Sequence, residues 1–377
     1  MKRVSLIALA LIVGCGLNFA QGNGPLFSTD VFCKGENGYD TFRIPAVVRA
    51  ESGVILAFAE ARRNSPKDYG DIDLVLKRST DGGRTWGDMT VVWDDRDNVC
   101  GNPSVVVSGR SGRVIVLATW NYGKDTERKI SLRESEDTRR VFCLYSDDEG
   151  LTWSDAREIT ADVKNPEWTW YATGPCHAIQ KVKFPHKGRI VVPCDHGDFD
   201  EKVSHSHIIY SDDDGMTWHL GGDIGAGNES TVAELKNGSL MLNMRGTRTP
   251  DRTGQYRTVS LSRDGGKTFS VPYKEKALIE PVCEASLINY CANGKLSSTL
   301  LFSNPECMPE RKNMTIKQSD DSGRTWHTVI LLSEKPAAYS DMVVLGNGDV
   351  GIFYETGEEG PYEKMVFSLI PAAVFTK

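Results

Sequence analysis

The chain has 377 residues, of which 40% are hydrophobic and 25% are charged, and its formal net charge is −7. This composition is typical of a soluble globular protein, and after residue 20 no apolar run is long enough to cross a bilayer, so an integral membrane protein is excluded. No stretch rich in Lys and Arg offsets the acidic average, which also excludes a nucleic-acid-binding protein.

Residues 1–20 have the pattern of an export signal. Lys2 and Arg3 precede an apolar run, and small residues follow it, as in a signal peptide. Cleavage after Ala20 is one interpretation. The other takes IVGC, ending at Cys15, as a bacterial lipobox whose cysteine carries a lipid anchor. Both predict an exported protein that is periplasmic, secreted or a cell-surface lipoprotein, and both leave residues 21–377 as a single domain.

Five copies of one eight-residue motif punctuate the rest of the chain. They are STDGGRTW, SDDEGLTW, SDDDGMTW, SRDGGKTF and SDDSGRTW, beginning at Ser79, Ser146, Ser211, Ser262 and Ser319. Alternating apolar and polar runs flank each copy, so each is expected in a hairpin turn. The aspartate can accept backbone N–H bonds, the glycine supplies positive φ, and the aromatic residue packs between strands. A calcium loop is the alternative, but no copy has the required ligand spacing.

The spacing of these motifs predicts the architecture. Successive copies begin 67, 65, 51 and 57 residues apart, as in repeat proteins. Units of about four short strands repeated radially form a β-propeller, and about 350 residues at a period near 60 give about six units. We therefore predict an all-β, six-bladed propeller with antiparallel four-stranded blades. The segment STDVFC would close the ring by pairing with VFSLIP near the C-terminus, which removes an open edge.

Eight cysteines follow the export segment, an even number that is compatible with disulfides outside the cytosol. Cys143 and Cys194 lie in strand-like runs, where a free cysteine serves as a small buried apolar residue. No pairing is assigned, and neither the cysteines nor the histidines have the spacing of a metal site.

The five motifs resemble the Asp boxes of the sialidase (exo-α-neuraminidase) superfamily, and FRIP, residues 42–45, resembles its first active-site motif. The resemblance covers essentially the whole mature chain. It implies hydrolysis of terminal α-linked sialic acid from glycoproteins, glycolipids or oligosaccharides, with retention of configuration through a tyrosyl-glycoside intermediate. It implies no cofactor and no metal, and we expect a monomer.

Three arginines match those with which this family binds the sialic acid carboxylate. They are Arg43 in FRIP, Arg245 in LNMRG and Arg311 in NPECMPERKNMT. Planar guanidinium groups donate paired hydrogen bonds to a carboxylate, which offsets its desolvation. Glu355 in FYETG resembles the glutamate that orients the first arginine.

The resemblance also implies a tyrosine nucleophile, Tyr339 in AAYSD, and a base, Glu229 in GNESTVAEL, that takes its proton. Sialidases are an exception to the usual carboxylate nucleophile. The anomeric carbon of sialic acid carries a carboxylate, which would repel an anionic nucleophile, whereas a phenol approaches neutral.

The acid/base is expected on a loop after the inner strand of the first blade, where AEARRNSPKDYGDIDLV supplies Asp68. Asp71 and Asp73 are alternatives, and we favour Asp68 because the other two read as part of the following strand. Arg62 resembles an arginine that binds polar substituents of the sugar. The resemblance implies that Asn102 also contacts the sugar, at a position where many bacterial relatives have Asp.

Two further segments each have two interpretations, one structural and one as part of the site. In WTWYATGPCHAIQ, residues 168–180, the two aromatics either floor a sugar subsite or pack between blades. The charged run GKDTERKISLRESEDTRR is interpreted as a solvated insertion loop, with a rim of the site as the alternative.

Three other functions are also compatible with the sequence. A purely structural propeller used for protein docking would show no preference for sialic acid. A trans-sialidase, intramolecular or intermolecular, would share all of these residues and would differ in how water is excluded from the intermediate. A non-catalytic sialic-acid-binding propeller would keep the arginines but would not need Tyr339, Glu229 and Asp68 together.

Overall fold

The computed structural model describes residues 24–199, 203–246, 255–291 and 295–376. These residues are mostly β-strand, with two short helices, α1 (Glu127–Ser131) and α2 (Thr160–Val163), and two 3-10 turns, η1 (Glu36–Gly38) and η2 (Ala372–Val374). None of the helices in these ranges is long and apolar enough to cross a membrane. The predicted export segment and Cys15 lie outside the described residues.

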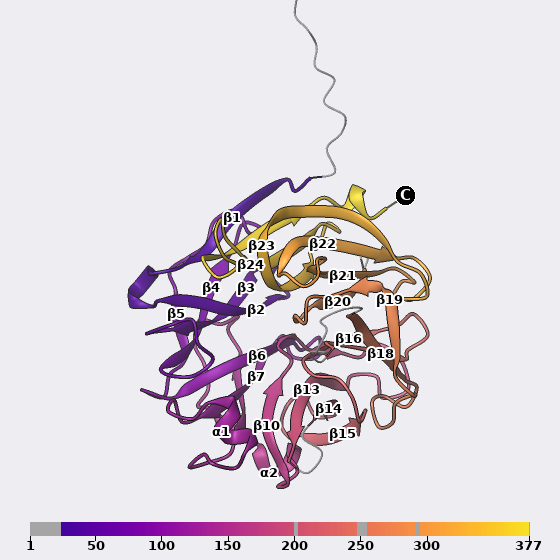
Figure 1. Cartoon of the computed structure of the whole chain (residues 1–377). Coiled ribbons are helices and arrows are strands. Elements are labelled where there is room, and N and C mark those ends of the chain that lie inside the picture. The colour runs from indigo at the N-terminus through magenta and orange to yellow at the C-terminus, as the bar shows by residue number, and fades with distance from the viewer. Residues whose placement is uncertain (1–23, 200–202, 247–254, 292–294, 377) are drawn as a thin grey trace, which may run out of the picture.

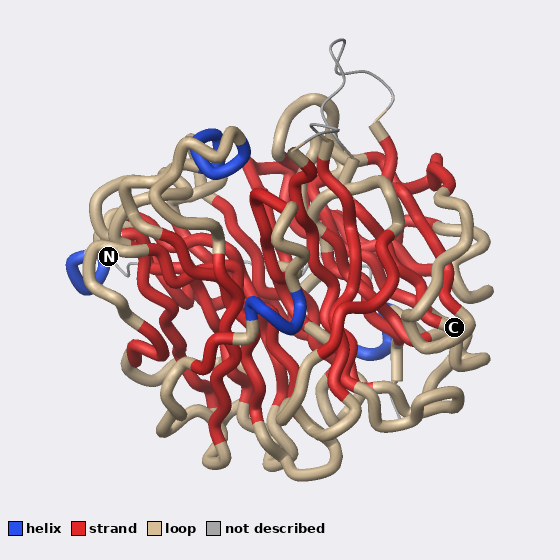
Figure 2. Tube along the Cα trace, turned by 90° about the horizontal axis from the view of Figure 1, so that it is seen from below, coloured by secondary structure: helices blue, strands red, loops and turns tan. Residues whose placement is uncertain are grey.

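The sheets are arranged around a common centre, and the chain runs around this ring from indigo to yellow (Figure 1). Seen from the side, the strands fill the middle of the molecule and loops gather at two opposite faces (Figure 2). The all-β prediction is confirmed.

The first sheet contains two antiparallel groups. One group is β2 (Thr41–Arg49), β3 (Ile55–Arg62), β4 (Ile72–Ser79) and β5 (Thr90–Trp93), and the other is β6 (Val99–Val107), β7 (Val114–Asn121), β8 (Arg140–Ser146) and β9 (Arg157–Glu158). A single parallel pair, Ile72 with Val99, joins the groups. The short β11 (Cys176–His177) is added in parallel to β6.

The next two sheets are smaller. The first has the order β10 (Trp168–Thr173), β13 (Ile190–Asp198), β14 (Ser204–Ser211) and β15 (His219–Asp223), with β12 (Ile179–Gln180) on β13. The second is β16 (Ser230–Glu234), β17 (Leu240–Met244), β18 (Tyr256–Ser262) and β19 (Tyr273–Ile279).

The last sheet closes the ring. It holds β20 (Ser286–Asn289), β21 (Leu300–Pro305), β22 (Lys312–Ser319), β23 (His327–Val344), β24 (Val350–Thr356), β25 (Lys364–Ile370) and β1 (Phe27–Cys33). The long β23 pairs with β22 through its first half and with β24 through its second half. The N-terminal β1 pairs antiparallel with β25, with Ser28 opposite Ser368. This confirms the predicted closure.

Each Asp box lies in a strand-to-strand turn, as predicted. In the first, Ser79 Oγ donates to Asp81 at 2.8 Å and accepts from the Gly83 amide at 2.8 Å. Thr85 donates its backbone N–H and its hydroxyl to Asp81 at 2.9 and 2.7 Å. The same four bonds recur around Asp148, Asp213, Asp264 and Asp321. Because both carboxylate oxygens bind within the turn, the geometry favours the structural role over a calcium loop.

The glycine of the box is required by space as well as by backbone geometry. Gly83 has φ +88°, and a Cβ there would lie 2.2 Å from the ring of Phe367. That ring also meets Trp86 edge to face, with centroids 5.4 Å apart. The box therefore anchors its turn to the neighbouring strand β25.

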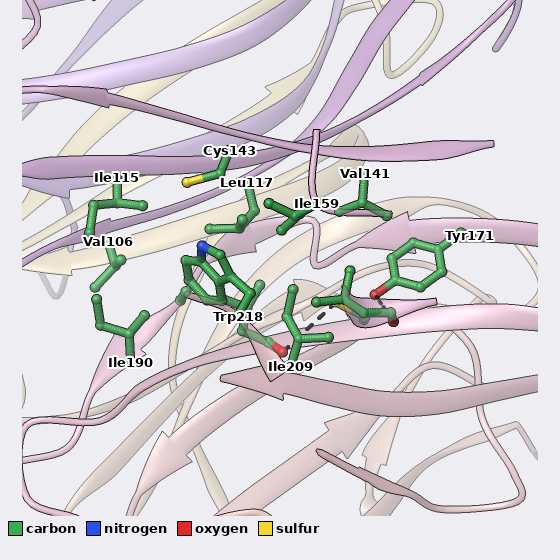
Figure 3. Packing of buried hydrophobic residues seen from close by; sticks show 14 of the residues in the cluster. Val106, Ile115, Leu117, Val141, Cys143, Ile159, Tyr171, Ile190, Ile209 and Trp218 are labelled. Atoms are coloured by element: carbon green, nitrogen blue, oxygen red, sulfur yellow. Dashed lines mark hydrogen bonds between the residues drawn. The ribbon is translucent and has the colours of Figure 1, made fainter. Parts of the chain in front are cut away.

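Apolar side chains fill the space between neighbouring sheets. Figure 3 shows one such core, in which Trp218 of the third Asp box, 2% exposed, packs among aliphatic residues of two sheets. Cys143 and Cys194 belong to this core, and all eight cysteines of the described residues are free thiols. The prediction that these two are buried apolar residues is confirmed.

Candidate active site

A cavity of about 550 Å³ is lined by residues from several strand groups and from the loops beside them. Its wall contains eight of the nine residues singled out in the sequence: Arg43, Arg62, Asp68, Asn102, Glu229, Arg245, Arg311 and Tyr339. The ninth, Glu355, is fully buried and bonded to Arg43. The fold thus brings together residues spread over some 300 positions.

Backbone irregularities coincide with the site residues. The pairing of β2 with β3 shifts register between Arg43 and Ala46, and β6 and β23 shift in the same way next to Asn102 and Tyr339. Ile44 has φ 61° and Asn102 has φ 50°, and positive φ is strained for a β-branched residue. Bulges of this kind re-aim side chains beside active sites.

Tyr339 lies in β23 with 5% of its surface exposed. Its hydroxyl is 2.7 Å from each carboxylate oxygen of Glu229, and Arg245 Nη1 lies 2.9 Å from the same hydroxyl. Arg245 is also ion-paired with Glu229. Burial, reinforced by the Glu229 charge, raises the pKa of the Tyr339 phenol well above its usual value. The phenol therefore stays protonated at neutral pH, with a carboxylate in place to accept its proton.

One buried carboxylate holds both Arg43 and the backbone of Tyr339. Glu355 Oε1 and Oε2 accept from Arg43 Nε and Nη2 at 2.9 and 3.3 Å. Glu355 also accepts from the amide of Tyr339 at 3.1 Å and from that of Ile44 at 2.9 Å. Glu355 thereby fixes the Arg43 guanidinium relative to the backbone of Tyr339.

Arg311 completes a group of three cations around Tyr339. It precedes β22 and donates to the carbonyl of Val282 at 2.8 Å and to the hydroxyl of Tyr362 at 2.9 Å. The guanidinium carbons of Arg43 and Arg311 lie 5.1 and 5.4 Å from the centroid of the Tyr339 ring. Three guanidinium groups around one side chain are chemically suited to bind an anion.

Tyr362 was not predicted from the sequence. Its ring centroid lies 4.1 Å from the Arg43 guanidinium, and its hydroxyl accepts from Arg311. It comes from the loop between β24 and β25, seven residues after Glu355. No residue pattern in that loop distinguishes this tyrosine from a surface residue.

Asp68 comes from the loop between β3 and β4 and is 70% exposed. Its carboxylate lies 2.7 Å from Arg62 Nη1 and 3.6 Å from Arg43 Nη1. Desolvation in the cavity acts to raise the pKa of Asp68, but the two guanidinium groups outweigh it and hold the pKa below its usual value. Arg62 is in turn held by Glu60, at 3.0 and 2.6 Å, and by the carbonyl of Pro66.

The two alternatives to Asp68 have other partners. Asp71 and Asp73, at the start of β4, each bind Arg63 at 2.9 Å. Asp73 is 1% exposed and also accepts from the Tyr39 hydroxyl. Neither lines the cavity, which favours Asp68.

The cavity is also lined by Arg139, which the sequence did not single out. Asn102 Oδ1 accepts from Arg139, whose guanidinium carbon lies 3.8 Å from the centroid of the Trp170 ring. Arg139 is 2% exposed, and its Nη1 has no hydrogen-bond partner among the described residues. Burial lowers the pKa of Arg139 to about 10. A buried, partly unsatisfied guanidinium at a cavity wall is suited to bind a polar group of a ligand.

The structure distinguishes between the alternatives for the charged run and for the two tryptophans. Arg139 and Glu127 belong to the charged run interpreted as a solvated insertion, yet they line the cavity, so the rim alternative holds for these two. Of the two tryptophans, Trp170 lines the cavity, whereas Trp168 is 8% exposed and stacks on His196 at 3.5 Å.

Comparison with known proteins identifies relatives of this chain. Residues 53–352 match the family described as the BNR repeat-like domain. A sialidase of Bacteroides fragilis is 33% identical over 85% of this chain, and a sialidase of Micromonospora viridifaciens is 32% identical over 91%. The chain spans 61% and 54% of the length of these two relatives.

A solved structure is similar over nearly the whole chain. The Hadza microbial sialidase Hz136 is 32% identical, covers 92% of this chain and 68% of its own, and superposes with a TM-score of 0.80. Sialidases of this kind are β-propellers, so the ring of sheets is a β-propeller.

Proposed function

The chain belongs to the bacterial sialidase family with Asp-box repeats, and we propose that it is an exo-α-sialidase, a glycoside hydrolase that removes terminal α-linked sialic acid from glycoproteins, glycolipids or oligosaccharides. One observation carries the proposal: the Tyr339 hydroxyl lies within 2.7 Å of Glu229 and 2.9 Å of Arg245, in a wall with three arginines. A binding protein would need the arginines but not a phenol held against a base.

The substrate carboxylate would bind Arg43, Arg245 and Arg311 through charge-assisted hydrogen bonds. The phenol oxygen of Tyr339 would attack the anomeric carbon while its proton moves to Glu229, and the bond to the leaving oxygen breaks as Asp68 protonates that oxygen. Asp68, now ionised, would take a proton from water, and the hydroxide would cleave the tyrosyl glycoside as the proton returns from Glu229 to Tyr339. Two inversions give retention.

Asp68 must carry a proton at the first step, although its two arginine neighbours favour the charged form in the free protein. A substrate carboxylate at Arg43 would cancel part of that positive charge. Binding would therefore raise the pKa of Asp68 toward the value that a general acid needs.

The remaining residues position the sugar and the catalytic groups. Glu355 would orient Arg43, with its hydrogen bond at 2.9 Å as support. Arg62, held by Glu60, and Asn102, held by Arg139, would bind polar substituents of the sugar. No step in this scheme uses a cofactor.

A fluorogenic α-sialoside and a sialylated oligosaccharide test the activity. We expect the purified protein to release fluorophore and free sialic acid, with the α-anomer as the first product by NMR. Binding of the sialoside without release would support the lectin alternative. Products that change when an acceptor sugar is added would identify a trans-sialidase, which no feature of the cavity favours over hydrolysis.

We also propose that the propeller has six blades of four antiparallel strands and that residues 21–377 form one domain. Six groups of four strands within the described residues support this proposal: β2–β5, β6–β9, β10 with β13–β15, β16–β19, β20–β23, and β23–β25 with β1. The long strand β23 belongs to both of the last two groups. A single cooperative unfolding transition, seen alike by fluorescence and circular dichroism, would agree with one domain.

For location, we propose an exported monomer that is periplasmic, secreted or lipid-anchored through Cys15. The pattern of residues 1–20 is the support. N-terminal sequencing of the mature protein separates the two cleavage sites, because a start at Gln21 excludes the lipid anchor. Sedimentation equilibrium checks the oligomeric state.

A further inference from the structure

Three metal-ligand side chains meet on the sheet of β10 and β13–β15, outside the cavity. His196 on β13 is paired across the sheet with His205 on β14, and Asp223 ends β15. Asp223 Oδ2 lies 3.7 Å from His196 Nε2 and 3.6 Å from His205 Nδ1. One ligand atom from each residue lies within 4.8 Å of the other two.

The hydrogen bonds behind His196 suit a metal ligand. His196 is fully buried, and its Nε2 has no hydrogen-bond partner among the described residues. Its Nδ1 lies 3.0 Å from His207 Nδ1, and His207 Nε2 lies 3.0 Å from the hydroxyl of Tyr171, which donates to the carbonyl of Val163. If each imidazole donates toward Tyr171, the proton of His196 is on Nδ1 and the lone pair of Nε2 faces Asp223.

We propose that His196, His205 and Asp223 bind a divalent cation of the zinc class, with water as the fourth ligand. Two imidazole nitrogens and one carboxylate oxygen match the preference of Zn²⁺, whereas Ca²⁺ and Mg²⁺ prefer oxygen ligands. Tetrahedral zinc with bonds of about 2.0–2.2 Å places its ligand atoms roughly 3.3–3.6 Å apart. The distances to Asp223 are close to this range, and rotation of Asp223, 41% exposed, can bring the set together and leave room for water.

The site lies between two segments that reach the cavity. Ser206, between His205 and His207 in sequence, exchanges backbone hydrogen bonds with the segment after Asp223: its carbonyl accepts from Ile224 at 3.0 Å and its amide donates to Ala226 at 2.8 Å. That segment leads to Glu229. On the other side, His196 stacks on Trp168, two residues before the cavity residue Trp170. A bound cation would hold both segments in place.

The sequence does not reveal this site because its ligands come from three strands, at positions 196, 205 and 223, with no short motif. The prediction of no metal rested on spacing along the chain. Strand pairing, which places His196 opposite His205, supplies the proximity.

Direct metal binding tests the proposal independently of any activity. The full chain without a histidine tag is freed of metal by chelator and titrated with ZnCl₂ by calorimetry, with bound zinc counted by atomic absorption. We expect one Zn²⁺ per chain and a rise in the melting temperature, with no rise in CaCl₂ or MgCl₂. Asp223→Asn and His205→Gln should each weaken binding at least tenfold.

His219→Gln is the matched control, because His219 is an exposed histidine on the same strand β15 but outside the cluster. It should bind zinc like the unmodified protein. With CoCl₂, the unmodified protein and His219→Gln should show the visible bands of tetrahedral Co²⁺, and His205→Gln should lose them. The proposal is overturned if the unmodified protein binds no Zn²⁺, or if Asp223→Asn and His219→Gln bind it equally well.

Discussion

The Asp-box turns and the cavity wall belong to the same strand groups, but hydrogen bonds in the boxes join neighbouring residues, whereas those in the wall join residues far apart in the sequence. In each box, four hydrogen bonds join residues within one eight-residue segment, and the set recurs five times. In the cavity, Arg43 binds Glu355, 312 positions away, and Tyr339 binds Glu229, 110 positions away. The repeated turns therefore stabilise the fold, whereas unrepeated residues from strands and from the loops beside them form the cavity wall.

The two regions also differ in how they shift pKa values. Local hydrogen bonds from Thr85 lower the pKa of Asp81 to about 2, and those from Thr152 do the same for Asp148. In the cavity, burial raises the pKa of the Tyr339 phenol. If the boxes stabilise the fold and the cavity wall catalyses the reaction, substitutions in the boxes change stability and leave turnover intact, whereas substitutions in the wall change turnover most.

The largest effect is expected for Tyr339→Phe, which removes the nucleophilic oxygen and leaves the ring. We expect kcat on a sialoside to fall by about 10³-fold or more. The control is Tyr290→Phe, because Tyr290 is also 5% exposed and donates its hydroxyl to a carbonyl, that of Gly348, outside the cavity. Equal kinetic losses in the two variants would remove Tyr339 from the mechanism.

Asp68→Ala removes the proposed acid/base. On a natural sialylated oligosaccharide we expect a loss of about 10²–10³-fold in kcat/KM, but a smaller loss on a fluorogenic sialoside, whose leaving group needs little protonation. Asp71→Ala is the control, since Asp71 binds Arg63 and does not line the cavity. Losses of the same size on both substrates would argue that Asp68 only binds the sugar.

Glu355→Gln tests whether a buried carboxylate positions Arg43. We expect KM to rise roughly tenfold, with a smaller fall in kcat, and stability to fall by about 3–5 kcal/mol because a buried ion pair loses one partner. Glu234→Gln is a matched control, since Glu234 is buried and binds Lys181 at 2.7 Å outside the cavity. It should lose stability without a change in KM. A rise in KM in both variants would mean that Glu355 acts only through stability.

Much of the fold was predictable because its signals are local. The Asp boxes and the strand alternation around them are short-range patterns. The pairing of β1 with β25 joins distant residues, such as Ser28 and Ser368, and was predictable only because an open sheet edge is unfavourable. The site residues were predictable where they lie in motifs, as Arg43 does in FRIP. Their roles in catalysis stay predictions until the variants are measured.

The features of the site that could not be predicted depend on contacts between distant segments. Arg139 looks like one more charge in a polar run, and only the fold places it on Trp170, buried beside Asn102. The bulges at Ile44 and Asn102 change which side chains face the cavity, and strand alternation alone cannot locate them. Tyr362 was missed for the same reason, since its partner Arg311 lies 51 positions away.

The smallest effect is expected for a substitution in an Asp box. Asp81→Ala removes the acceptor of three hydrogen bonds, and we expect the free energy of unfolding to fall by about 1–2 kcal/mol, with kcat unchanged.

The pKa of Asp81 in the folded protein is about 2, below about 3.9 in the unfolded chain. Its contribution is therefore complete above about pH 4 and is lost as the pH falls toward 2. Urea denaturation between pH 2 and 6 should thus show a smaller loss of stability on acidification for Asp81→Ala than for Asp88→Ala, an exposed aspartate after the same turn. Identical pH profiles, or a fall in kcat, would mean that the boxes and the cavity are not separable.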